Sequence, residues 1–303
     1  MKNICFVINN NYYDKMIVTL NSLIINDKDY YKVFILNNDL IDEQFVSLRK
    51  LFENKIEFID CKVSNEKFKD VTMMRNDHNM TAYFKLFIPE VIHNCERVLY
   101  LDCDIIINSN IDELYNIDFS NKSLAAVPDE MINKYELTYK KSIGMNDNDI
   151  YFNSGVVLFN LHKMKESYNI NKVFLYMATH KDLRFHDQEI LNVFFIKDYL
   201  KLDRIYNVMT SYTGIFDFIK YFFIRKVKKE YKIIHYCNLK PWNDNYVGKY
   251  KRLYYKQYKK VRIKLSNDFY EKNNIFKIIK MFFIKIKLYF KKRRSVWAWI
   301  IYF

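Results

Sequence analysis

The sequence predicts an α/β protein with a mostly parallel sheet. Short apolar runs alternate with segments in which apolar residues recur at helical spacing, which is the order expected for strand and helix units. The chain has 303 residues, of which 50% are hydrophobic, so it is large enough to bury a substantial core. Residues 1–248 contain no internal repeat and no linker rich in proline or serine, which predicts a single domain there.

The predicted elements follow from the positions of these runs. Strands are expected at residues 3–10, 32–36, 56–60, 156–161 and 233–236. Helices are expected at residues 12–26, 43–52, 81–91, 163–179 and 187–195. A further apolar run, RVLYLDCDIII, occupies residues 97–107 and is interrupted only by two aspartates. This run predicts a buried strand with carboxylates at its end.

The charge of the chain is unevenly distributed. The formal net charge of +14 by itself suggests a nucleic-acid partner. However, residues 249–303 contain 17 Lys and Arg and only two acidic residues, whereas residues 1–248 contain 32 basic and 33 acidic residues. The body of the protein is therefore close to neutral, and the basic excess belongs to a C-terminal tail.

The tail predicts a basic amphipathic helix that associates with an anionic membrane surface, chiefly through residues 265–303. Its basic face is formed by Lys277, Lys280, Lys287, Lys291 and Arg294. Its apolar face is formed by Ile278, Ile279, Phe282, Phe283, Ile286 and Phe290. The aromatic segment VWAWIIYF follows and is too short to span a bilayer. Non-specific binding of nucleic acid and a solvated extension without function are the alternatives.

Composition also bears on the type of site and on location. The four glycines form neither a G-x-G-x-x-G motif nor a Walker A loop, so a nucleotide has to be bound by other means. The five cysteines are scattered without C-x-x-C spacing, which indicates reduced thiols in the cytoplasm. The N-terminus lacks a signal-peptide pattern, and no uncharged apolar stretch approaches the ~18–20 residues that cross a bilayer. We therefore expect a cytoplasmic protein that lies peripherally at the inner face of the membrane.

Asp102 and Asp104 flank Cys103 at the end of the apolar run. In an open α/β sheet the carboxyl ends of the strands face the ligand crevice. Residues two apart in a strand share a face, so the two carboxylates can converge on one cation. Uncompensated carboxylates at the edge of a core repel each other and are costly to desolvate unless a metal or an arginine neutralises them. A solvated turn after the strand is the alternative interpretation.

Four segments, in this order, carry a resemblance to a known family: VLYLDCDII (98–106), YFNSGVVLFNL (151–161), FHDQEIL (185–191) and HYCNLKPW (235–242). Together they resemble glycosyltransferase family 8, whose members are retaining enzymes with a GT-A fold. That family includes bacterial lipooligosaccharide α-galactosyltransferases, core α-glucosyltransferases and glycogenin. The resemblance covers roughly residues 3–248 and implies a GT-A type, Rossmann-like sheet flanked by helices.

The resemblance implies a metal site. Asp102 and Asp104 are its carboxylate pair, and His235 supplies the third protein ligand. Two carboxylates and one imidazole suit Mn²⁺, with Mg²⁺ as the second choice, and diphosphate oxygens of a UDP-sugar would complete the coordination. Lys240 is similar to the family lysine that contacts the diphosphate, although the segment after Cys237 lacks a glycine and one further residue of the fuller family pattern. A core histidine and a surface lysine are the simpler alternatives.

The resemblance also implies a site for the donor sugar. Asn153 is similar to the asparagine that binds this sugar, and Ser154 and Gly155 let the backbone approach it. Asp187 and Gln188 are similar to an Asp-Gln pair in which the carboxylate holds sugar hydroxyls and the amide lies near the anomeric carbon. Asp187 and Gln188 are therefore the expected catalytic residues.

Two further positions are informative. Lys85 falls where relatives carry Arg or Lys facing the sugar and phosphates, and Glu189 stands where the galactosyltransferase pattern has a second Asp. Each assignment has a simpler structural alternative. These are a β-turn at Asn153, a helix N-cap at Asp187 and a solvated helix face at Lys85.

The nucleoside-binding segment of relatives resembles A-A-D-D-N-Y, and residues 7–12 of this chain are VINNNY. Asn9 replaces an Asp that is expected to accept a hydrogen bond from uracil N3–H, and an amide oxygen can still accept that bond. Tyr12 can stack on the uracil, or it is one of 26 tyrosines without that role. The complete set expected at the donor nucleotide is Val7, Asn9, Asn11, Tyr12, Lys85, Asp102, Cys103, Asp104, Asn153, Ser154, Gly155, Asp187, Gln188, His235 and Lys240.

The implied reaction is transfer of galactose or glucose from a UDP-sugar to a saccharide or glycolipid acceptor, with retention at the anomeric carbon. The setting is the biosynthesis of a cell-surface glycan of the lipooligosaccharide type. Mn²⁺ and Lys240 would stabilise the charge on departing UDP. Front-face attack, with Gln188 as a stabiliser, is the preferred mechanism because an amide oxygen is a weak nucleophile. The alternative function is a non-catalytic basic protein that binds nucleic acid or membrane.

Overall fold

The computed structural model describes residues 1–52, 54–68, 80–180, 183–210, 230–237, 240–243, 246 and 250–261. The predicted amphipathic helix of the tail and the aromatic segment after it lie outside the described residues. Among the helices of the described part, none has the length and apolar character needed to cross a membrane. The chain divides into two compact units, residues 1–208 with 230–234 and residues 209–229 with 235–303.

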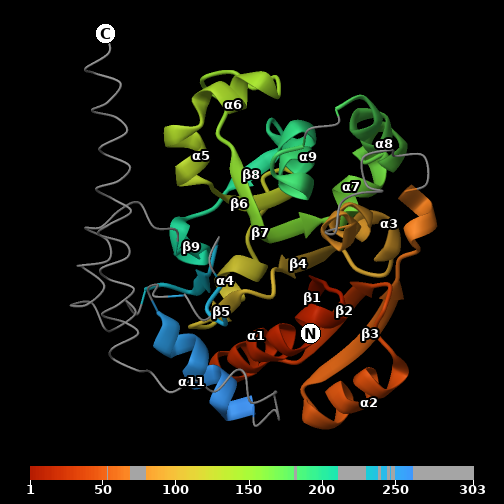
Figure 1. Cartoon of the computed structure of the whole chain (residues 1–303), viewed down its shortest axis with the longest axis vertical. Helices are drawn as coiled ribbons and strands as arrows, with labels where there is room; N and C mark the ends of the chain where they lie inside the picture. Colours follow the sequence, from red (N-terminus) through yellow and green to blue (C-terminus); the bar gives the residue numbers. More distant parts are fainter. Residues whose placement is uncertain are drawn as a thin grey trace, which may run out of the picture. The chain divides into compact units, whose positions relative to one another are not determined.

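A seven-stranded sheet with the order β3-β2-β1-β4-β7-β6-β8 forms the centre of the first unit (Figure 1). Its strands are β1 (Lys2–Val7), β2 (Tyr31–Asn37), β3 (Ile56–Lys62), β4 (Arg97–Leu101), β6 (Leu124–Pro128), β7 (Phe152–Asn160) and β8 (Tyr199–Lys201). A second sheet has the order β5-β10-β9, with β5 (Ile105–Ile107), β9 (Val208–Met209) and β10 (Ile233–His235).

The large sheet is mostly parallel, as the sequence predicts. β1 pairs in parallel with β2 and β4, β2 with β3, and β6 with β8, whereas β7 runs antiparallel to both β4 and β6. The strands β1, β2 and β3 progress toward one edge, and β4 lies on the other side of β1, so the strand order reverses at β1. In such sheets a crevice forms at this reversal, outside the carboxyl ends of the strands.

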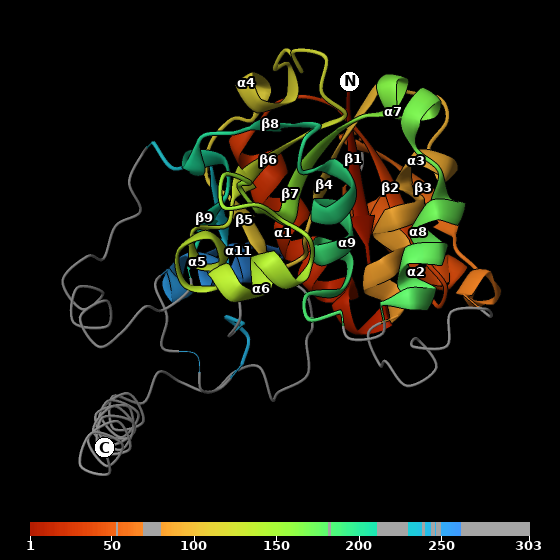
Figure 2. The ribbon, with the colours of Figure 1, turned by 90° about the horizontal axis from the view of Figure 1, so that it is seen from above.

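Helices of the first unit are α1 (Tyr13–Asn26), α2 (Asp42–Leu51), α3 (Ile88–Val91), α4 (Asp112–Tyr115), α5 (Glu130–Tyr135), α6 (Leu137–Ser142), α7 (Leu161–Ser167), α8 (Ile170–Thr179) and α9 (His186–Phe195). Short 3₁₀ helices occupy Asn10–Tyr12, Asn65–Phe68, Met80–Phe87 and Arg204–Tyr206. The 3₁₀ helix Met80–Phe87 and helices α7, α8 and α9 cover one face of the large sheet (Figure 2) and form a continuous apolar core with it.

Helix α1 is tied by two buried hydroxyls to the segment that carries the aspartate pair. The Oγ1 of Thr19 lies 3.1 Å from the carbonyl oxygen of Cys103 and 2.9 Å from that of Ile105. The backbone N–H of Ile107 donates to the Oγ of Ser22 at 2.9 Å. Because these contacts are buried and directional, α1 and residues 103–107 hold one another in register.

The apolar run at residues 97–107 differs from its prediction, since it forms two strands, β4 and β5, in place of one. The charged pair Asp102 and Asp104 interrupts the run, because carboxylates cannot continue a strand that is buried on both faces. The chain leaves the large sheet at this point and enters the second sheet with β5.

Two predicted helices also differ from expectation. The helix expected at residues 163–179 is divided into α7 and α8, and the side chain of Asn169 caps the second of these by accepting from the backbone N–H of Asn171. The segment expected to be helical at residues 81–91 is a 3₁₀ helix as far as Phe87 and becomes α-helical only in α3. Pro89 lies in the first turn of α3, where its missing N–H leaves no bond unmade.

Lys2 anchors the amino-terminal end of β1. Its Nζ lies 2.9 Å from a carboxylate oxygen of Asp27 and 2.8 Å from one of Asp29, and it also contacts Asp112. Burial would raise the pKa of Asp27, but hydrogen bonds from Lys2 and from the backbone outweigh it and lower this pKa. The pair therefore adds stability above pH 3.8, the ordinary value, and this stability is lost as the pH falls through the lowered pKa.

The second unit contains α11 (Lys251–Val261) and a group of aromatic rings. The ring of Tyr236 lies 5.9 Å from the rings of both Tyr246 and Tyr254, and Trp242 lies 5.7 Å from Tyr254. The hydroxyl of Tyr236 donates to the carbonyl oxygen of Tyr250 at 2.8 Å. These contacts place the start of α11 beside Tyr236 and Trp242. The domain boundary at residue 248 stays a prediction.

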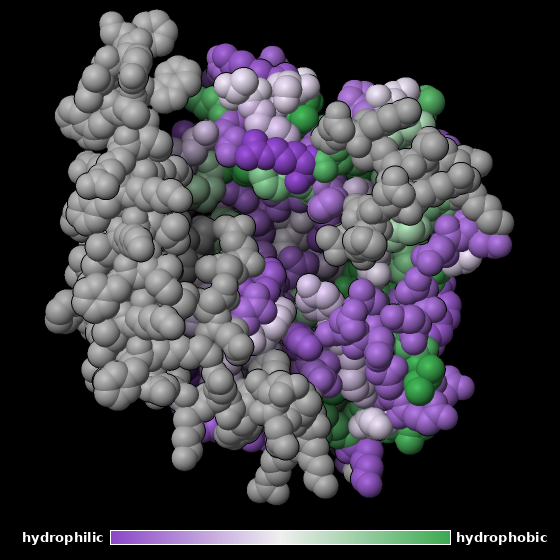
Figure 3. Space-filling view, in the orientation of Figure 1, coloured by the Kyte–Doolittle hydropathy of each residue, from purple (hydrophilic) through white to green (hydrophobic). Residues whose placement is uncertain are grey.

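Hydrophilic residues cover most of the described surface in the face shown in Figure 3, including the part over α2 and β3. Apolar residues form only small groups on this face, and Ile41 and Val46 beside and on α2 are among the exposed apolar side chains. Scattered apolar side chains of this kind are normal on protein surfaces. The described residues form no broad apolar patch on this face.

Candidate functional site

Most residues predicted for the site meet at one edge of the large sheet. Strand β4 ends at Leu101, which pairs with Val156 of the antiparallel strand β7. The backbone N–H of Asp102 donates to the carbonyl oxygen of Gly155 at 2.9 Å. The aspartate pair at the end of β4 is thus the direct neighbour of Asn153, Ser154 and Gly155 near the start of β7. This edge is the one at which the strand order reverses.

The two aspartates differ in environment. Asp104 is only 5% exposed, so a solvated turn does not describe it. Asp102 is half-buried, and its Oδ1 accepts a hydrogen bond of 2.5 Å from the hydroxyl of Tyr100. Tyr100 lies two residues earlier on the same face of β4 and therefore orients this carboxylate. Nothing in the sequence patterns used above identifies Tyr100 as part of the site.

Lys85 is the cation of the site. It is 3% exposed, and its Nζ lies 2.6 Å from Oδ2 of Asp187, 3.1 Å from the carbonyl oxygen of Ser154 and 3.8 Å from Oδ1 of Asp102. The same Nζ lies 4.2 Å from the ring centre of Tyr100. Burial lowers the pKa of Lys85, but Asp187 and Asp102 outweigh it and raise this pKa, so the ammonium stays charged. A solvated helix face does not describe this lysine.

The start of α9 supplies a carboxylate and an amide. Oδ2 of Asp187 accepts from the hydroxyl of Ser154 at 3.1 Å in addition to the bond from Lys85. Oε1 of Gln188 accepts from the backbone N–H of Ser154 at 3.0 Å. The N-cap of α9 is Phe185, with no side-chain cap, so Asp187 does not serve as the N-cap that the simpler interpretation required. His186 before it adopts a positive φ of 48°, which turns the chain sharply into α9.

Asn153 is the centre of a chain of polar side chains. Its Nδ2 donates to Asp129 at 3.3 Å, while its Oδ1 accepts from the backbone N–H of Gly155 at 3.0 Å and from Nδ2 of Asn207 at 2.9 Å. Asp129 is also the N-cap of α5, accepting from two backbone N–H groups. The sequence does not predict Asp129 and Asn207 at the site. Their hydrogen bonds to Asn153, from positions far away in the sequence, place them there.

Glu189 faces away from the aspartate pair. It is 3% exposed, and its Oε2 accepts from the hydroxyl of Tyr139 at 2.7 Å and from the backbone N–H of Arg184 at 3.0 Å. The guanidinium of Arg184 forms two hydrogen bonds, of 2.7 and 2.9 Å, with Glu136. These bonds fasten the α5–α6 segment to the turn that precedes Asp187.

The segment after β1 lies at the same sheet edge. Val7 is the last residue of β1, and Asn9 caps the 3₁₀ helix Asn10–Tyr12 with its side chain. Asn11 and Tyr12 are exposed, Tyr12 to 41%. Val7 and Asn9 are half-buried, and the role of these four residues at the nucleoside stays a prediction.

His235 is the last residue of β10, whose Ile233 and Ile234 belong to the first unit, and it is 3% exposed. Asp102 and Asp104 belong to the first unit and His235 to the second, and the metal site that these three residues would share stays a prediction. Two carboxylate oxygens and one imidazole nitrogen fit a hard to borderline divalent cation such as Mn²⁺. Lys240, in the second unit, donates to the carbonyl oxygen of Tyr236 at 3.3 Å.

Three carboxylates elsewhere in the first unit form an ion cluster with a lysine. The carboxylates of Asp27, Asp29 and Asp112 lie close enough to share a cation. The ammonium of Lys2 already contacts all three carboxylates. The protein's own ammonium group therefore already lies among these carboxylates and offsets part of their charge.

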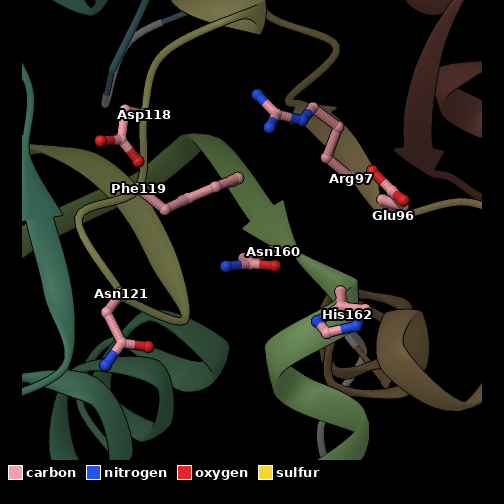
Figure 4. Close-up of a pocket in the computed structure, with 7 residues that line it drawn as sticks. All are labelled: Glu96, Arg97, Asp118, Phe119, Asn121, Asn160 and His162. Atoms are coloured by element: carbon pink, nitrogen blue, oxygen red, sulfur yellow. The ribbon is translucent and has the colours of Figure 1, made fainter.

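A cavity of about 350 Å³ lies at the opposite end of the sheet from the aspartate pair (Figure 4). Its lining residues are Glu96, Arg97, Asp118, Phe119, Asn121, Asn160 and His162. Arg97 is already engaged there, since its guanidinium donates to the carbonyl oxygens of Tyr115 and Ile117. None of the predicted site residues lines this cavity.

Comparison with known proteins defines the class. Residues 3–246 match the family model described as glycosyl transferase family 8. The chain therefore belongs to glycosyltransferase family 8, which confirms the resemblance carried by the four segments.

Individual relatives agree with this assignment. The chain is 32% identical over 180 residues to glycosyltransferase GlyF of Streptococcus pneumoniae, a match that covers 58% of this chain and 41% of GlyF. It is 28% identical over 198 residues to lipopolysaccharide 1,3-galactosyltransferase of Salmonella typhimurium, covering 62% of this chain and 56% of that protein. The chain thus spans less than half of some curated relatives, 41% for GlyF and 34% for the streptococcal GlyA.

The fold also matches a solved structure. The galactosyltransferase LgtC in complex with donor and acceptor sugar analogues gives a TM-score of 0.72 at 24% identity, covering 87% of this chain and 98% of LgtC. The seven-stranded sheet is therefore of the GT-A type, as predicted.

Proposed function

We propose that the chain is a retaining hexosyltransferase that moves galactose or glucose from a UDP-sugar to a saccharide or glycolipid acceptor. The observation that carries this proposal is the cluster of Lys85, Asp187 and Asp102 at the switch point of a family 8 sheet. A buried lysine surrounded by carboxylates at a ligand crevice provides both charge and hydrogen-bond acceptors for a sugar linked to a diphosphate. The named activity of the Salmonella relative supports a hexose donor and a lipopolysaccharide-type acceptor.

The metal proposal rests on the donor set. Asp102, Asp104 and His235, the ligand set that the family resemblance implies, would hold Mn²⁺, or Mg²⁺ as the second choice. When bound, such an ion supplies Lewis-acid stabilisation of negative charge on the diphosphate. Tyr100 orients Asp102 for this task through its 2.5 Å hydrogen bond.

The sugar is held from the α9 side. In the proposed complex, Asp187 accepts hydrogen bonds from sugar hydroxyls, and Lys85 fixes the position of that carboxylate. Gln188 lies near the anomeric carbon, and the bond from Ser154 N–H to its Oε1 fixes its amide. Lys240 contacts the diphosphate, and Val7, Asn9, Asn11 and Tyr12 contact the nucleoside.

Retention is proposed to follow front-face attack. Gln188 is a weak nucleophile because it is an amide, and its oxygen already accepts a hydrogen bond. The carboxylate of Glu189 accepts two hydrogen bonds within a buried network and faces Tyr139 and Arg184. Both observations support a stabilising environment for an oxocarbenium-like transition state over a covalent intermediate at these residues.

A donor panel tests the proposed reaction. We expect Mn²⁺-dependent release of UDP from UDP-galactose or UDP-glucose, faster than from UDP-N-acetylglucosamine, and already measurable as slow hydrolysis without an acceptor. Removal of the metal with a chelator should lower the rate by at least about a hundredfold, because several kcal/mol of leaving-group stabilisation are lost. A luminescent assay of nucleotide release measures both effects. Release from none of these donors at any Mn²⁺ concentration would contradict the proposal.

The acceptor and location are proposed from the tail. Residues 249–303 are strongly basic, and an amphipathic basic helix with an aromatic end would bind anionic lipid and bring the enzyme to a glycolipid acceptor at the inner face of the membrane. We expect the full chain to co-sediment with vesicles that contain 30% phosphatidylglycerol, about tenfold more than a variant lacking residues 265–303. Neutral phosphatidylcholine vesicles are the control. Equal binding of both proteins would contradict membrane anchoring by the tail.

A further inference from the structure

Asn9 lies where the proposed donor nucleotide has its base. It follows β1 after only Ile8, at the carboxyl end of the strand at which the strand order reverses. Ligands of open α/β sheets bind at this position. The inference below rests on the proposed function, because it concerns which nucleotide this site accepts.

The loop that carries Asn9 is fixed from the neighbouring strand and helix. The backbone N–H of Ile8 donates to Leu36 at 3.0 Å, and that of Asn10 donates to the carboxylate of Asp39 at 3.0 Å. The side chain of Gln44, on α2, donates to Oδ1 of Asn10 at 2.8 Å. These bonds tie the loop to β2, to the turn that follows β2 and to α2.

The amide of Asn9 has a defined orientation. Its Oδ1 accepts from the backbone N–H of Asn11 at 3.1 Å, and only the oxygen of the amide can do so. The Nδ2 is therefore the other end of the group, and it has no hydrogen-bond partner among the residues that the structure describes. Asn9 is half-buried, so part of this residue is open to a ligand. An aspartate in the same conformation would present a second acceptor oxygen in its place.

This exchange of acceptor for donor changes which base is complementary. Uracil carries a donor, N3–H, between two carbonyl groups, whereas cytosine carries an acceptor at N3. A carboxylate therefore matches uracil, and an NH₂ group matches N3 of cytosine or a carbonyl oxygen of either base. We infer that Asn9 is the residue that sets nucleobase specificity here, and that it makes the site accept CDP as well as UDP.

The test compares UDP and CDP binding to the full chain by calorimetry in the presence of Mn²⁺. We expect the native protein to bind the two nucleotides within about threefold of each other, since uracil N3–H can donate to the amide oxygen and cytosine N3 can accept from the amide NH₂. Asn9→Asp should bind UDP more tightly and CDP more weakly, which changes the ratio of the two affinities at least about tenfold. Asn9→Asp retains the acceptor for the N–H of Asn11, so the cap of the 3₁₀ helix is kept.

Two further variants separate base recognition from charge and from folding. Asn10→Asp adds the same charge one residue away and keeps the acceptor for Gln44, so it should leave the ratio of UDP to CDP affinity unchanged. Asn9→Ser keeps an acceptor for the cap and removes the NH₂ donor, so it should weaken CDP and leave UDP nearly unchanged. The serine variant decides the matter if the aspartate variant does not fold.

The outcomes distinguish the inference from the function beneath it. A ratio that changes less than about tenfold in Asn9→Asp, or that changes equally in Asn10→Asp, overturns the role of Asn9 while UDP binding upholds the proposed function. Binding of neither UDP nor CDP overturns the proposed function and the inference together.

Discussion

Replacing Asp104 by Asn is expected to abolish Mn²⁺-dependent sugar transfer, with kcat/KM falling at least about a thousandfold. Asp104 is one of the two carboxylates proposed to hold the metal. It is only 5% exposed, so water has little access to take its place as a ligand. The amide has nearly the same shape, so the loss would reflect charge and not packing. Nucleotide release from the preferred donor, measured across a Mn²⁺ titration, checks this expectation.

The matched control for this variant is Asp29→Asn. It removes the same charge from the acidic trio that Lys2 contacts, and its side chain is 51% exposed. Catalysis should stay within about twofold of native, because Asp29 is remote from the proposed site. Stability should change by only about 0–1 kcal/mol, because the carboxylate of Asp29 lies at the surface. An Asp104→Asn protein that folds, shows normal turnover and keeps the native Mn²⁺ response would refute the proposed metal site.

Replacing Lys85 by Met is expected to damage both stability and catalysis. The substitution leaves Asp187 buried without its 2.6 Å partner, and breaking a buried pair from one side costs about 3–5 kcal/mol. It also frees the carboxylate that is proposed to hold the sugar hydroxyls, so kcat/KM should fall at least about a hundredfold. Urea unfolding and donor turnover measure the two effects separately.

The conservative variant and the pH profile make this expectation sharper. Lys85→Arg keeps a cation beside Asp187 and should recover part of both losses, with the remainder reflecting the wider guanidinium. Because the pKa of Lys85 is raised above its ordinary value of 10.5, its stabilising charge is fully present below pH 10.5 and is lost only as the pH rises through the raised pKa. Activity between pH 6 and 9 should therefore show no titration of this lysine. Full activity of a folded Lys85→Met protein would contradict its role.

The sequence predicted the polar residues of the site better than their partners. Asp102, Asp104 and Asp187 stand in two of the four family segments, and Lys85 stands outside them at a position where relatives carry Arg or Lys. The structure brings Lys85, Asp102 and Asp187 together. Tyr100 was missed, although it stands in the same segment, because a tyrosine in an apolar run looks like a core residue until its hydroxyl is seen to meet a carboxylate.

Other features of the structure were not predicted from the sequence for a different physical reason. Asn207 contacts Asn153 across 54 positions of sequence, and Tyr139 meets Glu189 across 50 positions. Local periodicity carries no information on such pairings, since they depend on how strands and helices pack. The strand β6 was missed for a local reason: its sequence, LAAVP, contains alanines and a proline, which are uncommon in strands.

Helix α1 has a consequence for the range of donors. Its first turn follows the loop that carries Asn9, and the hydroxyls of Thr19 and Ser22 bind the segment just beyond Asp102. One helix thus connects the place proposed for the base with the place proposed for the diphosphate, and it fixes the distance between them. In the proposed complex, a donor is selected for the distance between its base and its diphosphate as well as for their chemistry. A sugar carried on a lipid phosphate has no base. Such a donor would occupy only the place proposed for the diphosphate and leave the place proposed for the base unused.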